Sequence, residues 1–272
     1  MRWYGLRAAL LAVALCAASL AAASIWLGLV GAAAVSALLV ALGWISFLSS
    51  ERTVLSAVGA RLVSEVEHPD LYKLVGETAR LARLPLPRIY VSPTAQPNIL
   101  TVGYGPRSAA VCCTEGLLRV LTPAELRAVL AHELAHVTRR DVAVSSWSAG
   151  VASLVGIRPF KALLLQIAAP SGREYGADTD GALLTGDPMA MASALRKIDT
   201  GAAASPLPPR GPLAAASHLM IAHPFPSAGA GRLLRTHPPT GERVRRLEAL
   251  AGEPRSLRAA EFRRTPFLPL PG

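Results

Sequence analysis

The sequence predicts a mainly helical protein with a small β-sheet (α+β), in which an N-terminal transmembrane helical hairpin precedes a folded domain. Residues 6–48 carry a single charge, Arg7, at their outer end, which predicts apolar, lipid-facing helices. From residue 50 onward, apolar residues recur mostly at helical spacing among charged ones. Pro and Gly turns separate three short runs with β-strand character, which are residues 88–92, 98–103 and 108–114.

The composition indicates a lipid bilayer as a partner. Of the 272 residues, 51% are hydrophobic but only 5% are aromatic, so aliphatic side chains supply the excess. The net charge of +10 is compatible with nucleic-acid binding or with Lys and Arg on the cytoplasmic side of a membrane protein. Because no basic stretch is interleaved with aromatic residues, we predict the membrane and no nucleic-acid partner.

The three cysteines predict no disulfide framework, because their number is odd and their spacing irregular. Cys112 and Cys113 are adjacent in a predicted strand, so their side chains should point to opposite faces of the sheet. This arrangement suits packing better than disulfide bonding and fits a reducing compartment.

Residues 1–49 make up the predicted membrane hairpin. The apolar run has about twice the ~20 residues that one helix needs to cross a bilayer. We expect helices over residues 6–23 and 25–48, joined by a very short turn. A cleavable signal peptide is the alternative for the first helix, because small residues at 21–23 could form a cleavage site; the second helix would still anchor the chain.

Flanking charges predict the orientation of this hairpin. Arg2 and Arg7 precede it, and Arg52 and Arg61 follow it. Under the positive-inside rule, both the N-terminus and the folded domain then lie in the cytoplasm. The protein is therefore expected to be a multi-pass protein of the cell membrane.

The segments after residue 50 follow from their patterns and breakers. Helices are expected over residues 51–67, 70–84, 122–140, 171–185, 188–199 and 240–251. Thr122 can cap its helix, with Pro123 in the first turn and Glu125 completing a capping box. Residues 201–212 predict a flexible loop and residues 253–272 a disordered tail.

A His-Glu-x-x-His segment inside the helix at 122–140 carries the chemistry. His132 and His136 lie four residues apart, on one helix face, where both imidazoles can bind one zinc ion per chain. Glu133 follows the first histidine and can take a proton from a water activated by that ion. Because His is scarce and the segment lies in a capped helix with apolar flanks, a chance match is disfavoured. The sequence thus predicts a zincin-type catalytic domain that hydrolyses peptide bonds.

Zinc needs a third protein ligand as well as an open position. A third histidine six residues after His136 is excluded, because Val142 stands there. Glu174, on a later predicted helix, can supply a carboxylate, with Asp178 on the same face to accept the free N–H of a ligand histidine. On spacing alone, Glu174 is equally well explained as a solvated helix carboxylate.

With these residues in view, the chain resembles the HtpX family of membrane zinc endopeptidases, relatives of the CAAX prenyl proteases. The likeness extends over residues 50–141 and 171–250 and rests on several motifs in order. These motifs are Pro97-Asn98 with the turn at 103–106, the zinc helix from Leu130 to Val137 with Arg140-Asp141, the segment from Arg173 to Asp178, and Thr236-His237-Pro238-Pro239-Thr240 with Arg243.

The resemblance implies roles that spacing alone does not. Glu174 becomes the expected third zinc ligand. His237 becomes a candidate helper that binds the oxyanion or orders the site, the alternative being a structural histidine at a helix start. Asn98 could bind the substrate backbone, or it could be a turn residue. The expected substrates are damaged or misassembled membrane proteins, whose peptide would add to an edge strand of the sheet.

The chain departs from the family pattern at two places. The family usually carries Ser-Arg four and three residues before the ligand glutamate, where this chain has Pro170 and Ser171. It also has two long hydrophobic segments between the zinc helix and the ligand helix, where this chain has only residues 142–169. His136 and Glu174 must reach one ion, so this segment should begin and end on the same side of the bilayer. We therefore expect a short hairpin there that does not fully cross the membrane.

The resulting division assigns residues 1–49 to the membrane hairpin, 50–141 and 171–252 to the catalytic domain, 142–170 to the short membrane-associated hairpin, and 253–272 to the tail. Two alternatives to a membrane-bound zinc endopeptidase remain open. One is an exported zinc peptidase released by signal cleavage, and the other is a non-catalytic membrane scaffold on the same fold.

Overall fold

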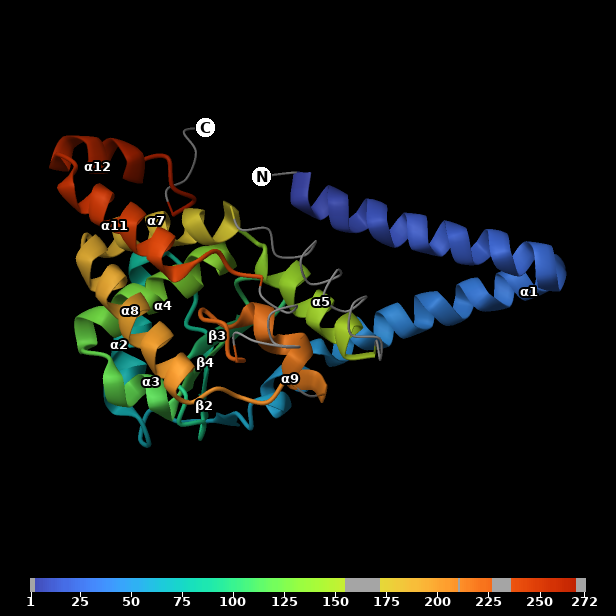
Figure 1. Cartoon of the computed structure of the whole chain (residues 1–272), viewed down its shortest axis with the longest axis horizontal. Helices are drawn as coiled ribbons and strands as arrows, with labels where there is room; N and C mark the ends of the chain where they lie inside the picture. The colour runs from blue at the N-terminus through green and yellow to red at the C-terminus, as the bar shows by residue number, and fades with distance from the viewer. Residues whose placement is uncertain (1–2, 155–171, 210, 227–235, 268–272) are drawn as a thin grey trace.

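The N-terminal half of the molecule begins with a long helical hairpin. In a computed structural model of the chain, which describes residues 3–154, 172–209, 211–226 and 236–267, α1 (Trp3–Ala57) folds back on itself (Figure 1). The reversal lies at Gly28, with φ 68° and ψ −174°. This backbone conformation is essentially restricted to glycine. The turn therefore falls a few residues after the position expected near residue 24.

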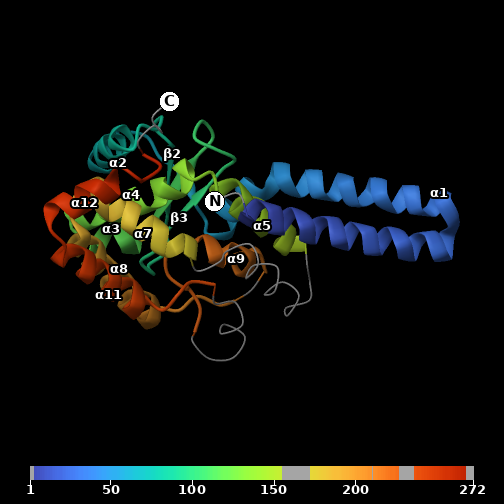
Figure 2. The ribbon, with the colours of Figure 1, turned by 90° about the horizontal axis from the view of Figure 1, so that it is seen from above.

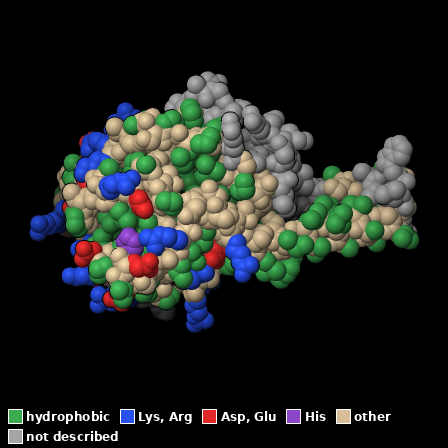
Figure 3. All heavy atoms as spheres, turned by 90° about the horizontal axis from the view of Figure 1, so that it is seen from below, with side chains coloured by type: hydrophobic (Ala, Val, Ile, Leu, Met, Phe, Trp, Pro, Cys, Tyr) green, Lys and Arg blue, Asp and Glu red, His purple; other side chains and the backbone are tan. Residues whose placement is uncertain are grey.

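The second arm of α1 has the properties of a membrane span. Within the described residues, Val30–Ala57 is the one helix long and apolar enough to cross a bilayer, with a mean hydropathy of 2.1. Only 11% of its apolar window is buried, and the arm projects from the rest of the molecule (Figure 2). Figure 3 shows hydrophobic side chains along the arm, whereas charged side chains gather on the body. An apolar surface exposed in this way fits a lipid environment.

A four-stranded sheet forms the centre of the body. Its strands are β1 (Arg61–Leu62), β2 (Arg88–Ser92), β3 (Ile99–Val102) and β4 (Ala110–Thr114), in the order β1-β2-β4-β3. Strands β2 and β4 are parallel, and the other two pairs are antiparallel. The three predicted strands are confirmed. The helix predicted over residues 51–67 is correct only as far as Ala57, where α1 ends and the chain turns through Gly59, at φ 62°, into β1.

Helices cover both faces of the sheet, as the side chains of β4 show. Cys113 packs in the larger core with residues of α2 (Pro69–Leu81), α4 (Pro123–Thr138) and other helices. Cys112 packs on the opposite face, against the end of α1 and α5 (Val142–Leu154). Burial raises the pKa of the Cys112 thiol to about 12. The prediction that the two cysteines point to opposite faces and pack is thus confirmed.

The remaining helices of the described residues complete the body. They are α3 (Glu115–Val120), α7 (Gly172–Thr185), α8 (Pro188–Ala204), α9 (Gly211–Ala216), the 3-10 turn η1 (Ser217–Leu219), α11 (Thr240–Gly252) and α12 (Arg255–Phe262). Two segments differ from expectation. α8 extends into the predicted loop at 201–212, and the predicted tail forms α12, after which Phe267 is buried in a cluster that includes residues of α2, α4 and α7. The first half of the expected hairpin at 142–170 forms α5; residues 155–170 lie outside the described chain.

The helix that carries the His-Glu-x-x-His segment is fixed at its start. The predicted capping box is present in α4: the Thr122 backbone N–H donates to Glu125 Oε2 at 2.8 Å, and Thr122 Oγ1 accepts from the Glu125 N–H. Ser193 and Lys197 of α8 also donate to this carboxylate, each at 2.7 Å. Burial raises the pKa of Glu125, but Lys197, Ser193 and Thr122 outweigh it and hold the pKa at about 2.

This lowered pKa predicts a pH-dependent contribution to stability. Glu125→Gln should lower the free energy of unfolding by about 1–2 kcal/mol at neutral pH, allowing for solvent screening. The folded-state pKa of about 2 lies below the ordinary glutamate pKa of 4.5, so the difference is fully present above pH 4.5 and disappears towards pH 2. Urea unfolding of the metal-free protein in detergent, followed by circular dichroism, measures it.

Glu115→Gln provides the control for this measurement. Glu115 begins α3 and pairs with Arg119 at 3.5 Å on the exposed surface, so its replacement should change the unfolding free energy by less than about 0.5 kcal/mol. A loss for Glu125→Gln that is the same at pH 7 and pH 3 would show that its carboxylate is not the stabilising group.

Candidate metal centre

Two histidines in the C-terminal half of α4 face each other. His132 and His136 lie one helical turn apart, and their Nε2 atoms are 3.3 Å from each other. Their rings meet edge to face, with centroids 4.9 Å apart. His132 is 1% exposed. The segment therefore presents two ring nitrogens to one point, as the sequence predicted from their spacing.

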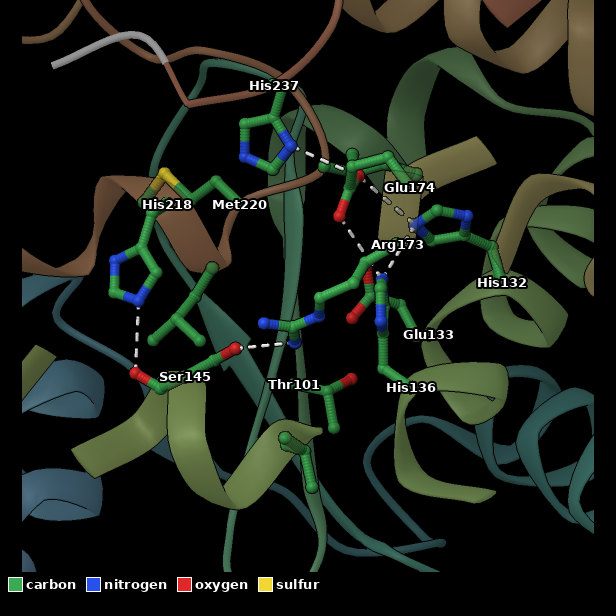
Figure 4. A pocket seen from close by; sticks show the side chains of 13 residues that line it. Thr101, His132, Glu133, His136, Ser145, Arg173, Glu174, His218, Met220 and His237 are labelled. Atoms are coloured by element: carbon green, nitrogen blue, oxygen red, sulfur yellow. Dashed lines mark hydrogen bonds and ion pairs between the residues drawn. The ribbon is translucent and has the colours of Figure 1, made fainter. Parts of the chain in front are cut away.

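Glu174 reaches the same point from α7. Its Oε1 lies 3.5 Å from His136 Nε2, and its Oε2 lies 3.8 Å from His132 Nε2 (Figure 4). The two helices can approach this closely because Gly181 faces α4. A Cβ atom at Gly181 would lie only 2.7 Å from the backbone nitrogen of His132. Among the described residues, His132, His136 and Glu174 are the group whose donor atoms could share a metal ion, all within 4.8 Å.

These three side chains fit a zinc ion. Tetrahedral zinc with bonds of about 2.0–2.1 Å places its ligand atoms roughly 3.3–3.4 Å apart. The nitrogen–nitrogen separation of 3.3 Å matches this spacing, and each ring nitrogen has one of the two Glu174 oxygens at a distance that exceeds it by a few tenths of an ångström. Two imidazoles and one carboxylate, with a cavity on the remaining side, are also the donor set of hydrolytic zinc sites.

Each candidate histidine ligand is oriented by a carboxylate behind it. His132 Nδ1 lies 2.9 Å from Asp178 Oδ1, and His136 Nδ1 lies 3.2 Å from Asp141 Oδ1. An N–H donated from Nδ1 leaves Nε2 of the same ring free for a metal. The structure therefore places Asp178 where the sequence predicted a supporting carboxylate.

Asp141 and two arginines were not predicted as parts of the site. Arg173 Nε donates to Asp141 Oδ2 at 2.9 Å. Arg243 donates two hydrogen bonds to the Asp178 carboxylate, at 2.7 and 2.8 Å. The sequence position of Asp141 could have indicated its role, because it lies three residues after the end of α4, next to Arg140, which turns the chain with φ 57°. No local pattern indicates the arginine pairs, which join residues 32 and 65 positions apart.

In the metal-free chain, the charges of the site favour an ionised Glu174 carboxylate and a protonated His136 ring. Burial raises the pKa of Glu174, but His237, His136 and Arg243 outweigh it and hold that pKa well below the usual range. Burial lowers the pKa of His136, but Asp141 outweighs this effect and raises the pKa to about 9 in the metal-free chain. A cation that binds here must therefore displace a proton from His136 at neutral pH.

Glu133 lies beside the three candidate ligands with its side chain facing a narrow cavity (Figure 4). It is 2% exposed, and burial raises its pKa. A carboxylate with a raised pKa can both accept and return a proton near neutral pH. The other cavity walls come from β3, α5, α7, the chain around η1 and the chain before α11. They are Thr101, Val142, Ser145, Arg173, His218, Leu219, Met220, Ile221 and His237.

His237 lies in the site, before the start of α11. Its Nδ1 is 3.0 Å from Glu174 Oε2, and its Nε2 has no hydrogen-bond partner among the described residues. The ring lines the cavity opposite Glu133 (Figure 4). The sequence left open whether this histidine assists the reaction or only starts a helix, and its position beside Glu174 permits the first role.

His218 is a buried cavity residue that the sequence analysis did not single out. Its Nε2 lies 2.9 Å from the Ser148 hydroxyl and 3.0 Å from the Ser145 carbonyl oxygen, both on α5. Burial lowers the pKa of His218 to about 4, so its ring is neutral at physiological pH. It joins the η1 segment to the helix that follows the zinc helix.

Asn98 lies apart from the cavity. It is 1% exposed, its Nδ2 donates to the Ala222 carbonyl at 3.0 Å, and its Oδ1 accepts from the backbone N–H groups of Ile99 and Ala222. It is not among the cavity-lining residues. These contacts occupy the amide with the protein's own backbone, so the structure corrects the expectation that Asn98 binds the substrate backbone.

The edge strand expected to receive a peptide is partly covered. Leu100 pairs with Met220 in an antiparallel bridge, and the Ile221 N–H donates to the Ile99 carbonyl at 3.1 Å. Backbone groups that face one edge recur at every second residue of a strand, so those of Thr101 face the same edge as those of Ile99. Thr101 also lines the cavity, although only 3% of its surface is exposed.

Comparisons with known proteins agree with this site. The chain matches the sequence profile of Peptidase family M48 over residues 65–251. It is 44% identical over 235 residues to a "Protease HtpX homolog" of Paenarthrobacter aurescens, an alignment that covers 76% of this chain and 81% of the relative. Similar proteins with the same description occur in Kineococcus radiotolerans, at 43% identity over 76% of this chain and 82% of the relative, and in Ralstonia nicotianae, at 38% over 79% and 86%.

The geometry predicts that zinc binding depends on Glu174. Glu174→Gln should weaken zinc binding by more than about 100-fold, because an amide replaces the anionic ligand. Asp180→Asn is the matched control: Asp180 is a buried carboxylate of the same helix, but it pairs with Arg139 outside the cluster. Zinc titration against a chelator, with the full chain in detergent, measures both affinities. Unchanged affinity for Glu174→Gln would remove Glu174 from the ligand set.

Proposed function

The chain belongs to peptidase family M48, and on this premise we propose that it is a membrane-bound zinc endopeptidase with His132, His136 and Glu174 as its zinc ligands. The observation that carries the proposal is the convergence of their donor atoms within 4.8 Å, beside the buried carboxylate of Glu133. Family membership also confirms the resemblance found in the sequence motifs.

The proposed reaction is hydrolysis of a peptide bond by water. A zinc ion held by the three ligands supplies Lewis acidity to the water and to the scissile carbonyl. Glu133 takes a proton from the attacking water on a carboxylate oxygen and passes it to the leaving amine nitrogen. Burial raises the pKa of Glu133, which makes its carboxylate a better proton acceptor.

His237 is proposed to stabilise the charge that develops on the carbonyl oxygen. Its Nδ1 lies 3.0 Å from Glu174 Oε2, and its Nε2, which has no hydrogen-bond partner among the described residues, can face the substrate. The position of the ring on the cavity wall supports this role. The peptide is proposed to pair with the backbone of Thr101, the cavity-lining residue of β3.

The proposed location is the cell membrane, with α1 crossing it as a hairpin and the catalytic domain in the cytoplasm. The exposed apolar arm Val30–Ala57 supports insertion, and the arginines flanking the hairpin support the orientation. Helix α5 packs along this arm, and Trp147 Nε1 donates to the Gly43 carbonyl at 3.4 Å. The resemblance favours misfolded membrane proteins as substrates. N-terminal sequencing tests the exported alternative, since a mature chain starting near Ser24 would support release.

The function is tested by Glu133→Gln. This variant should bind zinc as the wild type does but hydrolyse casein about 10³-fold more slowly, because the ligands remain and the proton carrier is lost. Zinc content and casein cleavage are measured on the same preparations of the full chain in detergent. A zinc-loaded wild type that is as inactive as Glu133→Gln would favour the non-catalytic scaffold.

A second variant tests the role of His237. We expect His237→Gln to lower kcat about 100-fold with little change in KM or zinc content, because a donor to the developing charge is lost. His68→Gln is the control, since His68 precedes α2 and its side chain makes no capping hydrogen bond. Unchanged kcat combined with a lower melting temperature would instead assign His237 a structural role at the start of α11.

A further inference from the structure

Arg243 of α11 is a buried arginine that contacts two separate parts of the site. It is 2% exposed. Its Nε and Nη2 donate to the two oxygens of Asp178, and its Nη1 donates to the Ile221 carbonyl at 2.9 Å. Nη1 also lies 3.7 Å from Glu174 Oε2. One guanidinium group thus joins α7 to the chain that follows η1.

The first contact fixes the orientation of a candidate metal ligand. A bidentate arginine holds the plane of a carboxylate, so Asp178 cannot rotate away from His132 Nδ1, which is 2.9 Å from its Oδ1. The tautomer and the ring angle of His132 then follow from Asp178. Lysine could not hold the carboxylate in this way, because its ammonium group lacks the planar fork of donors.

The second contact fixes a wall of the cavity. Leu219, Met220 and Ile221 line the cavity opposite the zinc helix. Ile221 is held on one side by β3, through its N–H and the Ile99 carbonyl, and on the other by Arg243, through its own carbonyl. Arg243, which orients His132 through Asp178, therefore also fixes the position of the segment 219–221 relative to the candidate metal ligands.

We propose that Arg243 is a positioning residue that sets the His132–Asp178 pair and the cavity wall at 219–221 together. The inference rests on the proposed zinc site and extends it. Arg243 acts on metal binding through Asp178 and on peptide binding through Ile221. The two effects are therefore separable by replacing Asp178.

The test is a double-mutant cycle on the full chain in detergent, with zinc affinity measured by chelator competition and KM and kcat measured with a peptide substrate. Arg243→Lys should weaken zinc binding about tenfold and raise KM about tenfold. In the Asp178→Asn background, replacing Arg243 should leave zinc affinity within about twofold but should still raise KM. Arg245→Lys is the control, because Arg245 lies on the same helix but is exposed.

Loss of a buried arginine beside an intact Asp178 can prevent folding, since a lone buried charge is costly. The comparison therefore uses Asp178→Asn, in which Arg243 keeps its contacts with the Ile221 carbonyl and Glu174, and Asp178→Asn/Arg243→Met, in which both charges are removed together. Equal zinc affinity and a higher KM for the double variant support the proposal. A double variant that binds zinc ten times more weakly than Asp178→Asn, or has the same KM, overturns it. Failure of the zinc site itself would be recognised separately, as a wild type that binds no zinc.

Discussion

The close packing of α7 against α4 is the constraint on which the site depends. Glu174 reaches the two histidines only because Gly181 allows the helix backbones to approach, where any side chain would overlap His132. Behind the two histidines, the packing is secured by two chains of hydrogen bonds and ion pairs, His132–Asp178–Arg243 and His136–Asp141–Arg173. The two histidines are therefore held by groups from three segments of the chain, α7, α11 and the turn after α4, and neither can turn without breaking a buried contact.

Local signals in the sequence were enough for much of this fold. The strand ranges, the capping box at Thr122 and the histidine pair each depend on residues within one turn or one strand. Arg243 and Asp178 illustrate the limit, because their pairing joins α11 to α7 and leaves no trace in the spacing of either helix. Asn98 illustrates another: a buried amide that binds its own backbone and an amide that binds a peptide look alike in sequence.

The covered edge of β3 changes how a peptide can enter. An uncovered edge strand would offer several backbone groups to a substrate. Here Met220 and Ile221 pair with Leu100 and Ile99, so the proposed pairing of a peptide with β3 is limited to Thr101, which lines the cavity beside the candidate metal ligands. Pairing limited to one residue gives little affinity by itself. Substrate binding must then depend on the cavity walls, including the segment that Arg243 holds.

The charges around the site show why a divalent cation suits it. Glu133, Glu174, Asp178 and Asp141 supply four carboxylates, and Arg173 and Arg243 supply two guanidinium groups. With all four carboxylates ionised, two negative charges remain in a buried region, where uncompensated charge is costly. The metal-free chain reduces this excess by retaining protons, which is why the pKa of His136 rises to about 9. A divalent ion between the three ligands would neutralise the same excess charge without those protons. Because Glu133 is not one of the three ligands, its carboxylate would remain available to carry the proton of the reaction.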